Sequence, residues 1–427
     1  MSGLPEAELI HDWNLEEGTP RPARASVELD DETLRDGLQS SSVRTPAIST
    51  KLEVLHLLAE IGVEAADIGL PGAGAHVERD VLRLALEVAE QRLPIRINCA
   101  ARTLEADIRP IAAISQRAGI AIEVACFLGS SPIRQYAEGW DLESMARLVR
   151  EAVAFATREG LPVMFVTEDT TRARPADLRR LYLEAVGAGA RRVCIADTVG
   201  HATPRGARAV VRFVRGLVDA SGAGVGVDWH GHNDRGLALA NSIAAIEAGA
   251  DRIHATVLGV GERVGNCALD HLLVNLELLG WSRRDLGPLG RLARLVSEAT
   301  GVPIPDGYPV LGRDAFRTQT GVHAAAIAKA RAKGDTWLAD RVYSGVPAAL
   351  VGRRQEVEIG PMSGQANVLH WLARHGLEPA PGLVAAILHA AKSAAATLDD
   401  EAVREVCRRC GVDPGSGGQP APHHGDP

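Results

Sequence analysis

The chain has 427 residues, of which 46% are hydrophobic and only 4% aromatic, and it contains 44 glycines. This composition is typical of α/β enzymes, and the length is sufficient for one large domain and a smaller one. The formal net charge is −8, and no block of Lys and Arg occurs, which argues against nucleic acid and anionic membranes as partners.

The sequence indicates a cytoplasmic protein without a membrane span. No uninterrupted apolar run approaches about 18 residues, and the N-terminus, MSGLPEAELIHDWN, is acidic, unlike a signal peptide. Six cysteines in so long a chain do not indicate a disulfide framework. Cys407 and Cys410 form a CxxC within a helical pattern but have no second pair, which favours ordinary reduced thiols over a metal or redox site.

From residue 27 onward, short apolar runs alternate with longer amphipathic ones. The short runs predict eight strands, at 27–33, 64–70, 95–102, 121–129, 162–169, 191–200, 224–232 and 251–259. Clear helical patterns lie at 49–62, 80–91, 141–160 and 176–190. Eight such units in about 250 residues predict an α/β protein with a (β/α)8 TIM barrel. A doubly wound sheet is the alternative, but no Gly-rich dinucleotide loop supports it.

The seventh predicted strand ends in the run His230-Gly-His232-Asn-Asp. Residues two apart on a strand point to the same face, so the two imidazoles project together. Neutral imidazoles followed by a carboxylate and an amide suit a divalent metal ion. A pair of core or surface histidines is the alternative interpretation.

In a TIM barrel the active site lies at the C-terminal ends of the strands. Polar residues lie at or just after the C-terminal ends of six of the predicted strands: Arg35, Asp36 and Gln39; Arg102; Ser130, Ser131 and Arg134; Glu168, Asp169 and Arg172; Asp197 and Thr198; His230 and His232. Only strand 8 separates strand 1 from strand 7 around a closed barrel. We therefore expect Asp36 to join the two histidines on one ion, either Mn²⁺, Mg²⁺, Co²⁺ or Zn²⁺, with positions left for substrate and water.

Four motifs make the resemblance to a known family specific. DETLRDGLQ, IADTVGHATP, HGHNDRGLALAN and GVGERVGN resemble the 2-isopropylmalate synthase/homocitrate synthase family over residues 27–370. Its members are acyltransferases (EC 2.3.3 type) that condense acetyl-CoA with a 2-oxo acid on a metal-dependent TIM barrel. The resemblance implies Arg35 as a catalytic arginine, Asp36, His230 and His232 as metal ligands, and Glu168 as the acidic residue ending strand 5. The substrate-binding residues predicted from the motifs and strand ends are Gln39, Arg102, Arg134 and Thr198.

The segment after the barrel, DAFRTQTGVHAAAIAKA followed by DRVYSGVPAAL, resembles the first accessory subdomain of this family. That subdomain reaches over an active site, usually that of the partner subunit, which implies a homodimer. His323 and Tyr343 match its catalytic histidine and tyrosine. We expect His323, with Tyr343 and Glu168 orienting it, to take the proton from the acetyl-CoA methyl group.

The expected organisation has five parts: an N-terminal extension (1–26), the TIM barrel (27–282), a linker with accessory subdomain I (283–362), helical subdomain II (363–411) and a Gly/Pro-rich disordered tail (412–427). Too little chain follows for the regulatory domain of leucine-inhibited synthases, so leucine feedback of that type is not expected.

Two departures from the family bear on the substrate. Leu38 replaces a glutamate of the first motif, which lowers negative charge near the metal, although Leu38 could equally pack. Arg134 stands where isopropylmalate-type enzymes have histidine, and homocitrate-type enzymes are more similar there. A guanidinium in the pocket favours a second anionic group, as in 2-oxoglutarate, oxaloacetate, phosphonopyruvate or phosphinopyruvate. A surface ion pair is the alternative for Arg134. DETLRDGLQSSS is also similar to the 2-phosphinomethylmalate synthases of antibiotic biosynthesis.

Other functions stay open on the sequence alone. A 2-isopropylmalate synthase would use 2-oxoisovalerate. A carbon–carbon lyase of the 3-hydroxy-3-methylglutaryl-CoA lyase type shares the phrase RDGLQ, and Cys267 resembles a lyase loop cysteine, but such lyases lack the region of His323 and Tyr343. A non-catalytic protein that keeps the barrel is the third alternative, and the intact set of metal and arginine positions argues against it.

Overall fold

The computed structural model describes residues 6–16, 22–23 and 26–414. The chain divides into two compact units, one of Asp12–Pro303 and one that combines Met1–His11 with Ile304–Pro427. The finer domain boundaries expected from the sequence stay predictions. Most of the predicted disordered tail, 412–427, and part of the predicted N-terminal extension lie outside the described residues.

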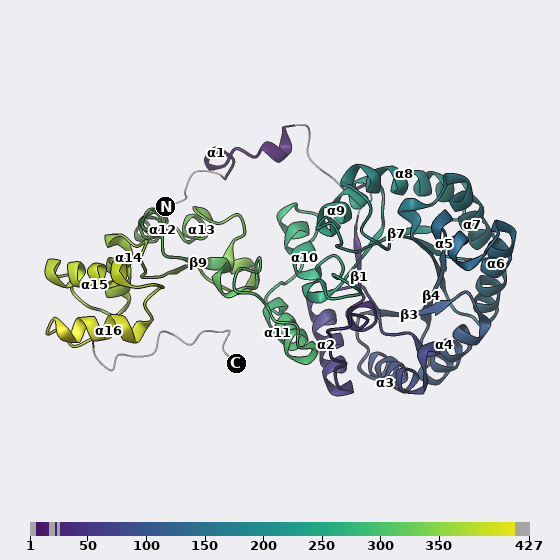
Figure 1. Ribbon diagram of the computed structural model, residues 1–427, viewed down its shortest axis with the longest axis horizontal. Helices are drawn as coiled ribbons and strands as arrows, with labels where there is room; N and C mark the ends of the chain where they lie inside the picture. The colour runs from purple at the N-terminus through teal and green to yellow at the C-terminus, as the bar shows by residue number, and fades with distance from the viewer. Residues whose placement is uncertain (1–5, 17–21, 24–25, 415–427) are drawn as a thin grey trace. The chain divides into compact units, whose positions relative to one another are not determined.

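The larger unit is a closed barrel of eight parallel strands that neighbour one another in sequence order (Figure 1). The strands are β1 (Glu28–Asp31), β2 (Ala65–Asp67), β3 (Arg96–Arg102), β4 (Ile122–Gly129), β5 (Val163–Glu168), β6 (Arg192–Asp197), β7 (Gly226–Gly231) and β8 (Arg252–Ala255). Pairing of β1 with β8, with Leu29 opposite Ile253, closes the barrel. The predicted α/β fold and TIM barrel are therefore confirmed, and each strand lies inside its predicted run.

Helices form a ring outside the strands (Figure 1). They are α2 (Ile48–Ile61), α3 (Ala75–Gln91), α4 (Glu105–Ala118), α5 (Pro132–Glu138), α6 (Leu142–Arg158), α7 (Pro175–Gly187), α8 (Pro204–Ala220), α9 (Ala238–Ala248), α10 (Leu269–Leu278) and α11 (Leu289–Thr300). Local signals fix their ends. The Asp141 side chain accepts a hydrogen bond from the Ser144 amide at the start of α6, and left-handed Gly62 and Gly119 end α2 and α4.

The inside of the barrel holds buried charges as well as apolar side chains. Arg252, at the start of β8, donates to Asp228 at 2.6 Å and to Glu123 at 2.5 Å. Arg192 reaches the other oxygen of Asp228 at 2.6 Å. Each charge is matched by an opposite one, as burial of ions requires, and this layer forms the floor beneath the C-terminal strand ends.

The second unit is mainly helical. It contains α1 (Glu6–Leu9), α12 (Gly321–Ala332), α13 (Thr336–Arg341), α14 (Gln365–Arg374), α15 (Pro381–Ser393), α16 (Asp400–Arg409) and a two-stranded sheet of β9 (Arg317–Thr318) and β10 (Glu356–Val357). Its apolar core includes Val368, Leu372, Ile387 and Val403. In the described part of the chain, no helix is both long and apolar enough to cross a bilayer.

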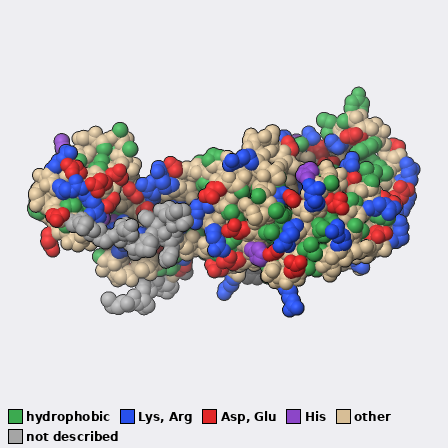
Figure 2. Space-filling model, turned by 90° about the horizontal axis from the view of Figure 1, so that it is seen from below, with side chains coloured by type: hydrophobic (Ala, Val, Ile, Leu, Met, Phe, Trp, Pro, Cys, Tyr) green, Lys and Arg blue, Asp and Glu red, His purple; other side chains and the backbone are tan. Residues whose placement is uncertain are grey.

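Surface charges of both signs are mixed. Figure 2 shows Lys and Arg side chains interspersed with Asp and Glu side chains over the face in view. Such mixing gives no single-sign field on that face for steering a polyanion.

Candidate metal centre and active-site cavity

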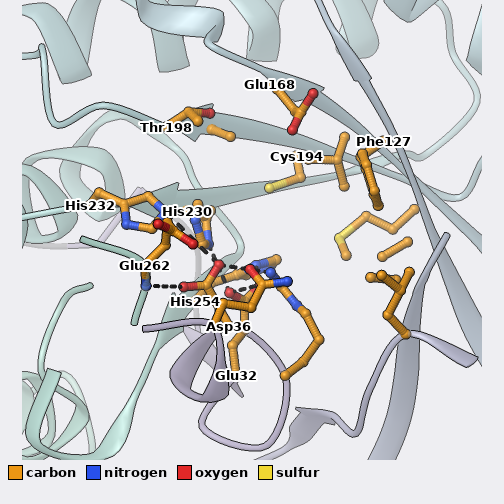
Figure 3. A pocket seen from close by; sticks show the side chains of 18 of the residues that line it. Glu32, Asp36, Phe127, Glu168, Cys194, Thr198, His230, His232, His254 and Glu262 are labelled. Atoms are coloured by element: carbon orange, nitrogen blue, oxygen red, sulfur yellow. Dashed lines mark hydrogen bonds and ion pairs between the residues drawn. The ribbon is translucent and has the colours of Figure 1, made fainter. Parts of the chain in front are cut away.

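A cavity of about 320 Å³ opens at the C-terminal end of the barrel strands. Its lining includes seven of the residues predicted from the sequence: Arg35, Asp36, Gln39, Glu168, Thr198, His230 and His232. Figure 3 shows the imidazoles gathered with the Glu32, Asp36 and Glu262 side chains on one side of this cavity, with Phe127 and Cys194 on the opposite side.

The three predicted metal ligands lie together. Asp36, His230 and His232 are buried, and each can offer one atom within 4.8 Å of the others. The His232 Nε2 and Asp36 Oδ2 atoms are 3.9 Å apart, and the two imidazole rings have centroids 4.9 Å apart. One carboxylate and two imidazoles held at this separation can bind a divalent cation.

Outer contacts to the Nδ1 atoms of both histidines leave their Nε2 atoms available. The His230 Nδ1 atom lies 2.9 Å from Glu32 Oε2, and His232 Nδ1 lies 3.2 Å from the carbonyl oxygen of Gly265. When Nδ1–H donates, Nε2 keeps its lone pair, which is the tautomer that ligates metals. Burial, and next the neighbouring His230, lower the pKa of His232 to about 4, so this ring is neutral at physiological pH.

Asn266 supplies an independent indication of a cation. Its amide nitrogen donates to Asp36 Oδ1 at 2.7 Å, whereas its Oδ1 atom is buried without a hydrogen-bond partner. Buried acceptors without partners are rare in native proteins. A cation beside Asp36 would satisfy this oxygen, so the residues present fit a bound divalent metal ion.

Two glycines of the motifs allow these side chains to approach. A Cβ atom on Gly37 would lie 2.9 Å from Val260 Cγ2, and one on Gly261 would lie 2.2 Å from Asn266 Nδ2 and 2.8 Å from Asp36 Oδ1. The turn after β1 and the loop after β8 can therefore pack closely only without side chains at these positions.

Arg35 is held by three carboxylates. Its guanidinium lies 2.8 Å from Glu32, 2.8 Å from Asp36 and 2.7 Å from Asp67. Burial raises the pKa of Asp67 to about 7, although the charge of Arg35 opposes this rise. Burial also disfavours ionisation of Asp36, but Arg35, His230 and His232 together outweigh it, so the pKa of Asp36 lies below its usual value and the carboxylate is charged.

Glu32 connects this cluster to a third histidine. Its Oε1 atom lies 2.7 Å from His254 Nδ1, and His254 Nε2 lies 3.1 Å from Asp228. Burial opposes the charged ring, but Glu32 and Asp228 outweigh it and raise the pKa of His254 to about 10. Glu32, His230 and His254 also come close enough to hold an ion. Because both nitrogens of His254 already face carboxylates, we interpret this second cluster as a hydrogen-bonded support for the first.

Two further predicted residues stand on the upper edge of the cavity in Figure 3. The Thr198 hydroxyl oxygen accepts from the Asp169 amide at 2.8 Å, which leaves its own proton to donate to a substrate. Glu168, at the end of β5, has a raised pKa because burial disfavours its charge, although Arg134 opposes the rise.

Arg102 and Arg134 are not among the residues that line the cavity. Arg102 binds Asp107 through two nitrogens, at 2.7 and 2.9 Å, and its side chain is 60% exposed. Arg134 lies 3.4 Å from Glu138 and 3.7 Å from Glu168. Both guanidiniums therefore have carboxylate partners, as in the ion-pair alternative for Arg134.

His323 and Tyr343 belong to the second unit. Their rings stack with centroids 3.9 Å apart, and Tyr343 is exposed. The structure thus brings these two predicted residues together with each other, and their role beside the barrel cavity stays a prediction.

The cysteines are all free, and five of the six, including Cys267 and Cys407, are buried. Burial raises the pKa of Cys267 to about 12, so this thiol is unlike the reactive, partly exposed cysteine that a lyase loop would present.

Sequence reasoning missed Glu32, Asn266 and His254. Glu32 and Asn266 lie inside quoted motifs, DETLRDGLQ and GVGERVGN, and their polar types were the available signal. His254 gave none, because one histidine in an apolar strand is ordinarily a core residue.

Comparisons with known proteins show which families and enzymes this chain is similar to. Residues 26–296 match the HMGL-like family. Homocitrate synthase AksA of Methanopyrus kandleri is 35% identical, covering 88% of each chain. Homocitrate synthase of Pyrococcus abyssi is 32% identical, over 89% of this chain and 98% of its own. 2-Isopropylmalate synthase of the same organism is 35% identical, over 70% of this chain and 62% of its own.

Among solved structures, the HMG-CoA lyase of Bacillus subtilis superposes with a TM-score of 0.56 at 19% identity, covering 67% of this chain and 97% of the lyase. At that identity the likeness concerns the fold alone. The relatives of higher identity confirm the predicted class of enzyme, an acyltransferase that converts an acyl group into an alkyl group on transfer. A closed barrel, four ordered motifs and a match over more than half of its length together show that the chain belongs to the HMGL-like family.

Proposed function

We propose that this protein condenses acetyl-CoA with a small 2-oxo acid to give a 2-alkylmalate-type product, with a divalent metal ion held by Asp36, His230 and His232. The observation that carries the proposal is the buried cluster of these three residues beside the partnerless Oδ1 atom of Asn266. Relatives named homocitrate synthase and 2-isopropylmalate synthase support the reaction type.

A metal bound at this cluster would supply Lewis-acid polarisation of the substrate ketone. The side chains do the rest. The Thr198 hydroxyl donates to the substrate carboxylate. Arg35 presents fixed positive charge at the cavity, where negative charge builds up on the ketone oxygen.

The condensation also needs a base, because the methyl group of acetyl-CoA is a weak acid. We assign this role to His323, with Tyr343 and Glu168 orienting it. The methyl carbon loses its proton to the base and bonds to the ketone carbon, and the ketone oxygen is protonated. Water then cleaves the thioester and releases CoA. The expected homodimer, in which a partner subunit supplies the accessory residues, is part of the same proposal.

The finer prediction, a 2-oxo acid with a second anionic group, rests on Arg134. In favour of it stands the position of this residue in α5, which follows β4, with its guanidinium 3.7 Å from Glu168 of the cavity lining. Its two carboxylate partners provide the opposing argument, which is developed below.

The test is release of CoA from acetyl-CoA, followed with a thiol reagent in the presence of Mn²⁺ and a panel of 2-oxo acids. Thiol release that needs both metal and a 2-oxo acid supports the proposal, and loss of release in His323→Ala supports the assigned base. Cleavage of 3-hydroxy-3-methylglutaryl-CoA without any condensation would replace it with the lyase alternative. Tight metal binding without either reaction would indicate a non-catalytic barrel.

A further inference from the structure

One wall of the cavity is apolar below Glu168 and Thr198, which stand at its upper edge. It is formed by residues of the β2–β6 side of the barrel: Leu70, Ala100, Ala125, Phe127, Met164, Val166, Cys194 and Ala196. On β4, β5 and β6 these positions alternate, two residues apart, as inward-facing positions of a barrel must. Figure 3 shows Phe127 and Cys194 from this wall facing the histidine cluster across open space.

The strand pairing places these residues in register. Ala100 is opposite Ala125, and Ala125 is opposite Met164. Phe127 is opposite Val166, and Val166 is opposite Cys194. Three alanines and a cysteine in this wall leave room beside the metal cluster that larger side chains would fill.

Each of Arg35, Arg102, Arg134, Arg252 and Arg263 has a carboxylate within 4 Å, although the Nε atom of Arg134 is buried without a hydrogen-bond partner. Arg134 and Arg102 are paired outside the lining, as described above. Arg263, which lines the cavity, binds Asp234 at 2.9 Å and the carbonyl oxygen of Thr198 at 2.6 Å. Arg252, which lies 3.2 Å from the sulfur of Met164, is held by Asp228 and Glu123. A second anionic group on the substrate would therefore face an apolar wall and the Glu168 carboxylate, and burial of an unpaired charge is costly.

Resting on the proposed function, we infer that this wall binds the side chain of the 2-oxo acid and that this side chain is uncharged and aliphatic, as in pyruvate, 2-oxobutyrate or 2-oxoisovalerate. The inference goes against the expectation of a second anionic group, because the guanidinium on which that expectation rests is paired with two carboxylates.

The experiment measures kcat/KM by CoA release for two sets of substrates with the full-length protein. One set is pyruvate, 2-oxobutyrate and 2-oxoisovalerate, and the other is oxaloacetate, 2-oxoglutarate and phosphonopyruvate. We expect the best uncharged acid to exceed every doubly anionic one by at least about 10-fold. A doubly anionic acid that ranks first would overturn the inference while leaving the condensation intact. Absence of release with all six acids would instead refute the proposed function.

Three variants sharpen the result. Ala125→Leu reduces the space at the wall and should shift preference toward pyruvate by about 10-fold or more relative to the unaltered protein. Because this change can overpack the barrel, Ala100→Val provides a smaller version, and thermal unfolding identifies a variant that fails to fold. Arg134→Gln tests the opposing expectation directly, and on this inference it should leave the order of substrates unchanged. A selective loss of doubly anionic substrates in Arg134→Gln would contradict the inference.

Discussion

The two sides of the cavity are built by different forces. On the metal side, Glu32, Asp36, His230 and His232 are fixed by ion pairs and hydrogen bonds to neighbouring polar groups. On the opposite side, residues such as Ala125, Phe127 and Met164 meet the cavity only with apolar atoms. Hydrogen-bonded groups tolerate little displacement, whereas packed apolar groups can be exchanged at constant volume. The metal side should therefore determine whether reaction occurs, and the apolar side which acid reacts.

Removal of a metal ligand should give the largest effect and is the strongest test of this division. Asp36→Ala, His230→Ala or His232→Ala should lower metal affinity by more than about 100-fold, because even loss of an outer hydrogen-bond partner costs about 10–100-fold. Calorimetric titration with Mn²⁺ measures the affinity directly, and CoA release should fall below detection. Full activity in any of these variants would contradict the assignment of the metal centre.

Glu32→Gln should have an intermediate effect. The carboxylate holds Arg35, His230 and His254 together, and a glutamine cannot accept equally from all three. We expect metal affinity to fall by about 10–100-fold while the barrel remains folded. Glu90→Gln, on the exposed surface of α3, is the matched control for loss of one negative charge. Equal affinities in the two variants would show that Glu32 does not orient the ligand.

Phe127→Leu should give the smallest effect and should leave the metal side untouched. Phe127 contributes only apolar surface to the cavity. We therefore expect the ratio of kcat/KM for 2-oxoisovalerate to kcat/KM for pyruvate to change by up to about 10-fold relative to the unaltered protein. The Mn²⁺ affinity should stay within about twofold. A large loss of metal affinity would break the comparison, since it would show that the two sides are coupled.

Much of the architecture is readable from local sequence. The strand runs and helical patterns predicted the closed barrel, because strand and helix periods depend on residues only a few positions apart. The barrel in turn allowed Asp36 to be placed near His230 and His232, and the structure brings these three together. Backbone geometry alone carries that inference, since strand ends of a closed barrel share one face.

The partners of charged side chains were not readable in this way. Glu32 meets His254, 222 positions along the chain, and Asn266 meets Asp36, 230 positions away. Likewise, nothing in GSSPIRQY shows that Arg134 points to Glu168 on the neighbouring strand. Side-chain direction and pairing depend on packing between distant segments, which no local pattern contains.

The sequence by itself therefore determined the barrel, the family and the location of the cluster of Asp36, His230 and His232, since all three follow from short-range periodicity and from motifs at strand ends. Only the tertiary structure decided which arginines are already paired and which wall of the cavity is mainly apolar. The physical reason is that a charge acts through its neighbours in space, and these neighbours are assembled only when the barrel closes.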